Sequence, residues 1–559
     1  GRAHLTRGRA RSVGLDSPAQ RRVADIRFAR LERPRWRPDR SLAESAWVGA
    51  NETLQVGTRY ELRFQIGAPA DGNLVSGPQV PFDELVPELK RDHHHELDVV
   101  VFEQGLACQS ERRQRIRLPF EGASEVARFV VVAPAPGKAG LRLSVYLNNA
   151  LLQSFSVQAR VTRQEGRPGS RVSVSATPDF SRVPLFQGVE RVAPRPFAVA
   201  LNASGGSHDV MVKTDSGSYQ VRIPADELTA ASNQLRKLLD SVTQHEDQKP
   251  KYGKVRAEEA RFAADVWSLA DAGRDLLSKL FNDPGLRTEL SRLSQLAEQT
   301  IQINRIAGPS LPWGLLYEFR LPLTAPATIC MGEGCGHTSQ SAPVLCINGF
   351  WGVRHKLEQL VNSGHEYAAK LAASTLGYAL DPAVFPDLDA AWSQGSGAIT
   401  LGEEVLDGLE QASGCGVFGL FGTHRRTKVG AKDRSYPRLH VGPRDRHVSR
   451  AALNDAMRTP WTGAVRPLVL LMACGTSVAR DCFGDLAQPL LTKGALGVIA
   501  TEGVVFSDVV TKYTLDLLDR LKAGATIGAA SRDAVTNLLR QRDPRGFAFT
   551  IIGCADLKC

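Results

Sequence analysis

The sequence predicts a multidomain protein that consists of an N-terminal antiparallel β-sandwich, a middle helical region and a C-terminal α/β/α sandwich. Three observations predict this order. Residues 46–165 alternate apolar and polar side chains with the period of a half-buried strand. Residues 226–306 carry apolar side chains at helical spacing. Residues 311–559 alternate short apolar runs with amphipathic stretches, as a parallel sheet with crossover helices requires.

Length and composition limit the classes to which the protein can belong. A chain of 559 residues is too long for one ordinary core. Its 43% hydrophobic and 23% charged residues are typical of soluble globular proteins and exclude collagen-like and disordered classes. No apolar run approaches the roughly 18 residues of a membrane-spanning helix, so we expect no membrane span. Nine cysteines without paired spacing favour a reducing compartment, and we expect a cytoplasmic protein.

Residues 1–45 are predicted to form a basic, Arg-rich tail. Residues 1–40 contain twelve arginines and four acidic residues, whereas the whole chain has a net charge of +10. The rest of the chain is therefore nearly neutral, which argues against a nucleic-acid-binding body. We expect contact with nucleic acid only through residues 1–40. The competing interpretation, a solvated terminus, is favoured because few aromatic residues are interleaved with the arginines.

The predicted sandwich and the segment after it carry no catalytic constellation. In 46–165 the residue pair Asn148-Asn149 is expected to turn one strand back onto the next. Residues 166–225 are predicted to be a linker, rich in Gly, Ser, Pro and Arg at its start, followed by a short β region. Residues 226–306 are predicted to be helical, with a last helix over 286–306.

Two residues in the C-terminal region stand directly after apolar runs that are predicted to be strands. Residues 416–422 lead to His424, and residues 467–473 lead to Cys474. Parallel strands present their carboxyl ends at one edge of the sheet, where reactive groups are usually placed. If the two strands are neighbours, a thiol nucleophile and an imidazole base meet there. Their separation of about 50 residues and the run Ala473-Cys474-Gly475 are similar to the caspase signature.

The C-terminal region resembles the CHAT family of bacterial caspase-like cysteine peptidases, which are relatives of caspases and separase. The resemblance covers roughly 311–557 and implies a caspase-like α/β/α sandwich with Cys474 and His424 as a catalytic dyad. The stretches that carry it are 311–317, the strand before His424, 470–474, 486–491, 494–501, 524–528, 547–553 and 555–557.

The oxyanion site departs from the family pattern. The resemblance implies Gly after the histidine, whose backbone N–H helps to hold the tetrahedral oxyanion, but here Arg425 follows His424. Any residue except Pro offers that N–H, so we expect the backbone N–H groups of Arg425 and Gly475 to bind the oxyanion. The bulky cation of Arg425 then borders the cleft.

The loop after the strand that follows the cysteine builds part of the substrate pocket in this fold. Glu502 and Asp508 lie in that loop and are candidate ligands for a substrate Arg or Lys. For Asp508 the competing interpretation is the N-cap of a helix over 509–522, which we favour.

Four metal-competent residues lie in one predicted loop. Cys330, Cys335, His337 and Cys346 form the spacing Cys-x4-Cys-x-His-x8-Cys, which offers a full set of zinc ligands. The cluster lacks the paired Cys-x2-Cys knuckles of common zinc motifs. We therefore expect no required cofactor, and we regard ordinary thiols as the better interpretation than structural zinc.

The sequence thus favours a regulated, caspase-like cysteine endopeptidase that acts on protein or peptide substrates. An activating or regulatory protein partner is expected to bind through the N-terminal domains. The alternative is a catalytically inactive, caspase-like scaffold in a signalling or defence assembly. Intact Cys474 and His424 argue against the alternative, whereas Arg425 favours it.

Overall fold

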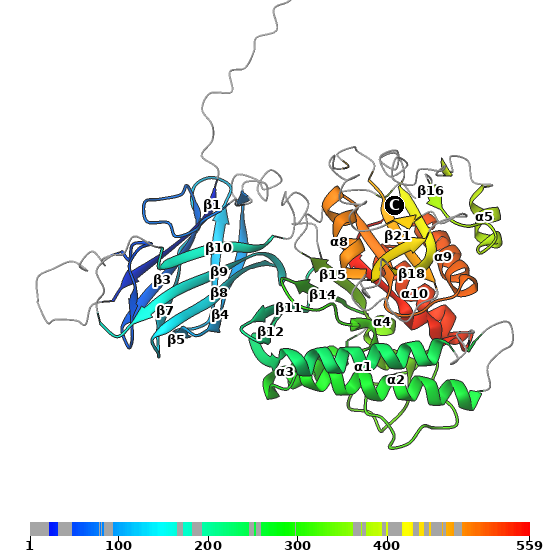
Figure 1. Cartoon of the computed structure of the whole chain (residues 1–559). Helices are drawn as coiled ribbons and strands as arrows, with labels where there is room; N and C mark the ends of the chain where they lie inside the picture. The colour runs from blue at the N-terminus through cyan, green and yellow to red at the C-terminus, as the bar shows by residue number, and fades with distance from the viewer. Residues whose placement is uncertain are drawn as a thin grey trace, which may run out of the picture.

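The computed structural model shows a multidomain α/β protein with several sheets (Figure 1). None of the helices in the part it describes is both long and apolar enough to cross a membrane. The structure describes residues 22–31, 47–77, 79, 81–82, 93–164, 172–181, 193–244, 251–252, 259–296, 298–361, 371, 376–393, 399–400, 416–428, 435–440, 447–448, 461, 466–474 and 483–558.

The N-terminal part is a β-sandwich of two sheets, ordered β1-β3-β7-β5 and β10-β9-β8-β4-β6. One apolar core joins their facing sides. Asn148 and Asn149 have positive φ angles of 51° and 60° and connect β8 to β9, which confirms the predicted hairpin. The strands are β1 (Val23–Arg30), β3 (Arg59–Gly67), β4 (His94–Gln104), β5 (Ala107–Cys108), β6 (Arg113–Pro119), β7 (Ala127–Val132), β8 (Gly137–Leu147), β9 (Ala150–Thr162) and β10 (Val174–Ser181).

The sandwich extends beyond the predicted 46–165 at both ends. Strand β1 comes from the predicted basic tail and pairs along its whole length with β3. Ile26 and Phe28 are fully buried, and Arg22 donates to the carbonyl oxygens of Pro119 and Gly122. The high arginine content of 1–45 concealed this short alternating pattern. Strand β10, from the predicted linker, pairs with β9.

A five-stranded sheet, ordered β13-β12-β11-β14-β15, follows the sandwich. The helix predicted over 286–306 is wrong in its second half, because the segment Thr300–Arg305 is strand β14. The β-branched residues Thr300, Ile301 and Ile303 favour a strand there, and β14 runs parallel to both neighbours. The strands are β11 (Phe197–Ser204), β12 (Ser207–Thr214), β13 (Ser218–Pro224), β14 and β15 (Lys356–Val361).

Helices α1 (Ala225–Thr243) and α2 (Glu259–Leu280) lie side by side in Figure 1. The shorter α3 (Pro284–Leu293) begins at Asp283, whose side chain accepts a hydrogen bond from the backbone N–H of Leu286 at 2.9 Å. The apolar stripe of α1 belongs to the same core as residues of the C-terminal sheet. The helical region is therefore packed onto the C-terminal part.

The C-terminal part contains an eight-stranded sheet with the main order β17-β16-β18-β21-β22-β23. Its first five strands are parallel, and β23 is antiparallel to β22. The strands on this path are β16 (Leu376–Ala379), β17 (Ile399–Thr400), β18 (Val417–Lys428), β21 (Leu468–Cys474), β22 (Gly497–Thr501) and β23 (Phe549–Gly553); β19 (Ser435–His440) and β20 (His447–Val448) extend it beyond β18.

Both faces of this sheet are buried, as its unbroken apolar strands predict. Along β21, Leu470 and Met472 belong to one core, and Val469 and Leu471 belong to another. Helices α5 (Pro386–Ser393), α9 (Ser507–Lys522) and α10 (Ile527–Arg540) supply the first core, and α8 (Phe483–Lys493) supplies the second.

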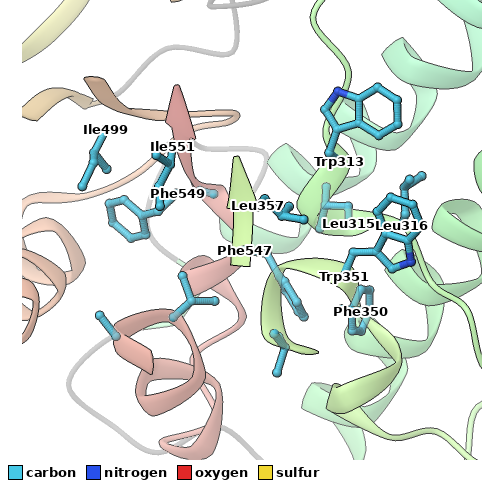
Figure 2. Close-up of a cluster of buried hydrophobic side chains, with 14 of the residues drawn as sticks. Trp313, Leu315, Leu316, Phe350, Trp351, Leu357, Ile499, Phe547, Phe549 and Ile551 are labelled. Atoms are coloured by element: carbon cyan, nitrogen blue, oxygen red, sulfur yellow. The ribbon is translucent and has the colours of Figure 1, made fainter. Parts of the chain in front are cut away.

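The core that contains Leu470 and Met472 also contains apolar residues of the segment 311–317. Figure 2 shows Trp313 and Trp351 in the same apolar cluster as Phe547 of the C-terminal part. The rings of Trp313 and Trp351 are stacked with centroids 6.5 Å apart. Gly273 of α2 touches this segment so closely that a Cβ there would lie 2.0 Å from the carbonyl oxygen of Leu315. The middle helices, this segment and the C-terminal sheet therefore share one core.

Candidate active site

Strands β18 and β21 are parallel neighbours, as the hypothesis of a shared strand edge requires. Their register runs from Val417 opposite Leu468 to Thr423 opposite Cys474. His424 is thus the next residue after the register partner of Cys474.

Strand β18 does not end where the sequence predicts. It continues through His424 and Arg425 to Lys428, and this extension pairs with β19, with His424 opposite Leu439 and Arg425 opposite Arg438. The predicted end of this strand, before His424, is therefore wrong. The sequence did not predict that residues 423–428 pair with a neighbouring strand, because this stretch is polar. Gly475 lies outside the described residues.

Glu502 directly follows β22, close to the carboxyl edge of the sheet. Its Oε2 accepts hydrogen bonds from Nε and Nη2 of Arg236 at 3.0 and 2.7 Å. Both side chains are nearly buried, with exposed fractions of 10% for Glu502 and 8% for Arg236. Arg236 also donates to the carbonyl oxygen of Ser310 at 2.9 Å. The carboxylate proposed for substrate binding thus already has a cation from helix α1.

Asp508 is not the N-cap of its helix. Helix α9 begins at Ser507 with Phe506 as N-cap, so Asp508 lies within the first turn. Its two oxygens accept hydrogen bonds from Nη1 and Nη2 of Arg545 at 2.9 and 2.8 Å. Arg545 is fully buried and also pairs with Asp543, and these carboxylates hold the pKa of its guanidinium above the ordinary value despite burial. The sequence did not predict that Arg236 pairs with Glu502 or that Arg545 pairs with Asp508, because only the fold brings these residues together.

The four metal-competent residues come together. The ligand atoms of Cys330, Cys335, His337 and Cys346 all lie within 4.8 Å of one another. Burial raises the pKa of the Cys346 thiol. Burial also acts to raise the pKa of the Cys335 thiol. Hydrogen bonds from the His337 backbone and from neighbouring side chains outweigh burial there, so the pKa of that thiol is lowered overall. This cluster lies in the loop before β15 and contributes no residue to the edge formed by β18 and β21.

Comparisons with known proteins give only a distant structural similarity. No family model and no curated protein matches this chain. Two crystal structures of the Saccharomyces cerevisiae separase–securin complex, at 3.0 and 2.6 Å resolution, match with 10% sequence identity. The matches cover 65% and 64% of this chain and 30% of the matched chain in each case, with TM-scores of 0.37 and 0.33.

Proposed function

We propose that this protein is a cysteine endopeptidase with a caspase-like C-terminal domain, in which Cys474 is the nucleophile and His424 the general base. The observation that carries the proposal is the register of β18 and β21, which pairs Thr423 with Cys474 where the parallel pairing of the two strands ends. Reactive groups of open α/β sheets are usually placed at this edge.

In the proposed reaction, His424 accepts the proton of the Cys474 thiol, and the thiolate attacks the carbonyl carbon of the scissile peptide bond. The backbone N–H groups of Arg425 and Gly475 donate to the oxyanion that forms. As the C–N bond breaks, His424 donates the proton to the leaving amine. Water, deprotonated by His424, then hydrolyses the thioester and restores the free thiol.

The substrates we propose are proteins or peptides, and the N-terminal domains are proposed to bind a regulatory partner. Contacts between the sandwich and the rest of the chain support this role. Phe102 of β4 and Leu360 of β15 belong to one buried cluster, and Gln359 of β15 donates to Thr550 of β23 at 2.7 Å. The sandwich thus contacts β15, and β15 in turn contacts the eight-stranded sheet.

One observation favours the alternative function, an inactive scaffold. His424 is part of the extended strand β18 and is paired with β19, whereas a general base commonly lies in a loop. A scaffold needs no reactive thiol, so the two functions differ in what happens at Cys474.

Cleavage of a complex peptide library by the full chain tests the proposal. We expect cleavage by the wild type and by a Cys108→Ser control, which changes a partly buried thiol of the sandwich. Cys474→Ala and His424→Ala should each abolish cleavage, and the double variant should be no worse, because the two residues act as one unit. Full activity in either single variant contradicts the dyad.

A further inference from the structure

The loop between Tyr317 and Phe350 gathers three thiols and one imidazole at a single point. The Sγ atoms of Cys335 and Cys346 are 3.5 Å apart, and the ligand atoms of Cys330 and His337 complete a group in which no separation exceeds 4.8 Å. Two sulfur ligands at about 2.3 Å from a tetrahedral zinc ion lie about 3.8 Å apart. The spacing therefore matches four ligands around one ion.

The backbone is shaped to bring these ligands together. Cys330 and Cys346 form a parallel β-bridge, in which the N–H of Cys330 donates to Leu345 at 2.9 Å. Between Cys330 and Cys335 the chain turns through Gly332 and Gly334, whose φ angles are 81° and 59°. These left-handed conformations strain residues with a side chain.

A second layer of contacts orients the ligands. Asn348 donates to the carbonyl oxygen of Gly332 at 2.9 Å and to Sγ of Cys335 at 3.4 Å. A Cβ at Gly332 would lie 2.3 Å from Oδ1 of Asn348, so this contact requires glycine. The Nδ1 atom of His337 is buried and has no hydrogen-bond partner within the described residues. Donors to sulfur and an unsatisfied imidazole nitrogen are features of a metal site.

We propose that Cys330, Cys335, His337 and Cys346 bind one structural zinc ion. Three soft thiolates and an imidazole select zinc over calcium or magnesium. Four protein ligands complete a tetrahedral shell and leave no position for a substrate or a reactive water, so the role is structural. The sequence spacing alone did not favour this site, because the ligands are not paired in Cys-x2-Cys knuckles.

The residues around the site favour a bound zinc ion in two ways: they balance the charge of the zinc-bound site, and they leave a route by which the ion can reach the ligands. Three thiolates and Zn²⁺ carry a net charge of −1, and a cavity of about 500 Å³ beside Cys335 is lined by Arg354, Arg520, Arg532 and Arg540. Glu298 and Asp533 also line the cavity, so its lining is positive overall beside the negatively charged site. Because Cys335 and Gly332 line the cavity, an ion or a chelator can reach the site through it.

The zinc ion would fix the loop to the core of the C-terminal part. The Tyr317 hydroxyl donates to the carbonyl oxygen of Val344 at 3.1 Å and accepts from the N–H of Cys346 at 3.2 Å. On the other side, the hydroxyls of Ser339 and Ser294 are 2.7 Å apart and join the loop to the end of α3. Loss of the ion should therefore loosen the contact between the helical region and the segment before β15.

Elemental analysis of the full chain, purified without chelator, tests this proposal. We expect about one zinc ion per chain in the wild type. Cys335→Ser and His337→Ala should lose most of it, whereas the matched control Cys108→Ser should retain it. Zinc-free wild-type protein, or full zinc content in both ligand variants, overturns the proposal.

A second measurement uses only wild-type protein and does not depend on whether the variants fold. Alkylation followed by mass spectrometry should modify Cys330, Cys335 and Cys346 only after a zinc chelator is added. The chelator should also lower the melting temperature, and zinc but not magnesium should restore it. Three thiols that react at once without chelator, or a disulfide between Cys335 and Cys346, overturn the proposal.

Discussion

Glu502 and Arg236 form a nearly buried ion pair although 266 residues separate them in the sequence. The pair connects helix α1 to the loop that follows β22. In the same place, Oδ1 of Asp240 accepts the N–H of Val504 at 3.1 Å, and a Cβ at Gly503 would contact Leu239 at 2.9 Å. Helix α1 thus fixes the position of the loop that follows β22.

We predict that Glu502→Gln lowers the free energy of unfolding by about 1–3 kcal/mol, because a buried hydrogen-bonded charge loses its partner. Urea unfolding of the full chain measures this effect. Asp275→Asn is the matched control, since it removes one carboxylate of an exposed pair with Lys279 and should cost at most about 1 kcal/mol. Equal losses in the two variants contradict a stabilising role of the pair.

The same substitution tests whether Glu502 binds substrate, and Asp508→Asn does so for the second carboxylate. Both groups already pair with an arginine of this chain, so we expect cleavage of basic and apolar peptides to fall by the same factor. Specificity constants for both peptide classes provide the measurement. A selective loss for peptides with Arg or Lys before the scissile bond would assign that carboxylate to substrate binding.

The C-terminal part is predicted not to fold properly without the preceding strands and helices. A fragment of 311–559 lacks β11 to β14 and so leaves β15 without the strand with which it pairs. It also lacks α1 and α2, whose apolar residues share its core. We expect 311–559 to be less soluble and to melt at a lower temperature than 193–559. Equal melting temperatures for the two fragments would contradict this packing.

Arg195 is predicted to be a major stabilising residue of the C-terminal part. It is fully buried and pairs with Glu358 at 2.8 Å and Asp556 at 2.7 Å, so it connects the start of the five-stranded sheet to the end of the chain. Arg195→Ala leaves Glu358 buried without its cation and should cost about 3–5 kcal/mol in unfolding free energy. The exposed control Lys279→Ala should cost about 1 kcal/mol or less. A loss at Arg195 no larger than the control rejects this role.

Stability is predicted to rise with pH above about 8 through Lys213. Burial lowers the pKa of Lys213 to about 8 from 10.5, even though Asp98 lies 3.4 Å from its Nζ. Between these pH values the unfolded chain binds more protons than the folded chain, so the unfolding free energy increases with pH. Below and above this window the contribution of Lys213 is constant. Unfolding measured across the window should show a smaller rise in Lys213→Met, and an unchanged rise would contradict the assignment.

The sequence predicted those helices and strands whose pattern of apolar and polar residues is complete within a short stretch of the chain. Helix α8 (Phe483–Lys493) is one of the amphipathic stretches that the sequence predicts within 311–559. The sequence did not predict strand β1. Only three apolar positions of its eight residues face the core, and the surrounding segment is rich in arginine. The sequence did not predict strand β14, because only six residues separate it from helix α3 and its apolar residues resembled a continuation of that helix.

The same holds for the candidate sites: features within one stretch of the sequence could be predicted, and contacts between distant residues could not. The apolar runs before His424 and Cys474 predicted two strands, and the structure has β18 and β21 there as parallel neighbours. The spacing of the four proposed zinc ligands was visible in the sequence, but the glycine turns and Asn348 that bring them together were not. Arg236 and Arg545 pair with carboxylates across the fold, and such pairs depend on tertiary packing that one sequence does not reveal.

Labelling with a thiol-reactive peptide probe tests the central claim most directly. The full chain is treated with the probe, and modified cysteines are located by mass spectrometry in wild type, Cys474→Ala and His424→Ala. The proposed dyad predicts modification at Cys474 alone in the wild type, none in Cys474→Ala, and labelling slower by about 100-fold or more in His424→Ala. An unreactive Cys474 in a folded chain would contradict the peptidase and favour the scaffold.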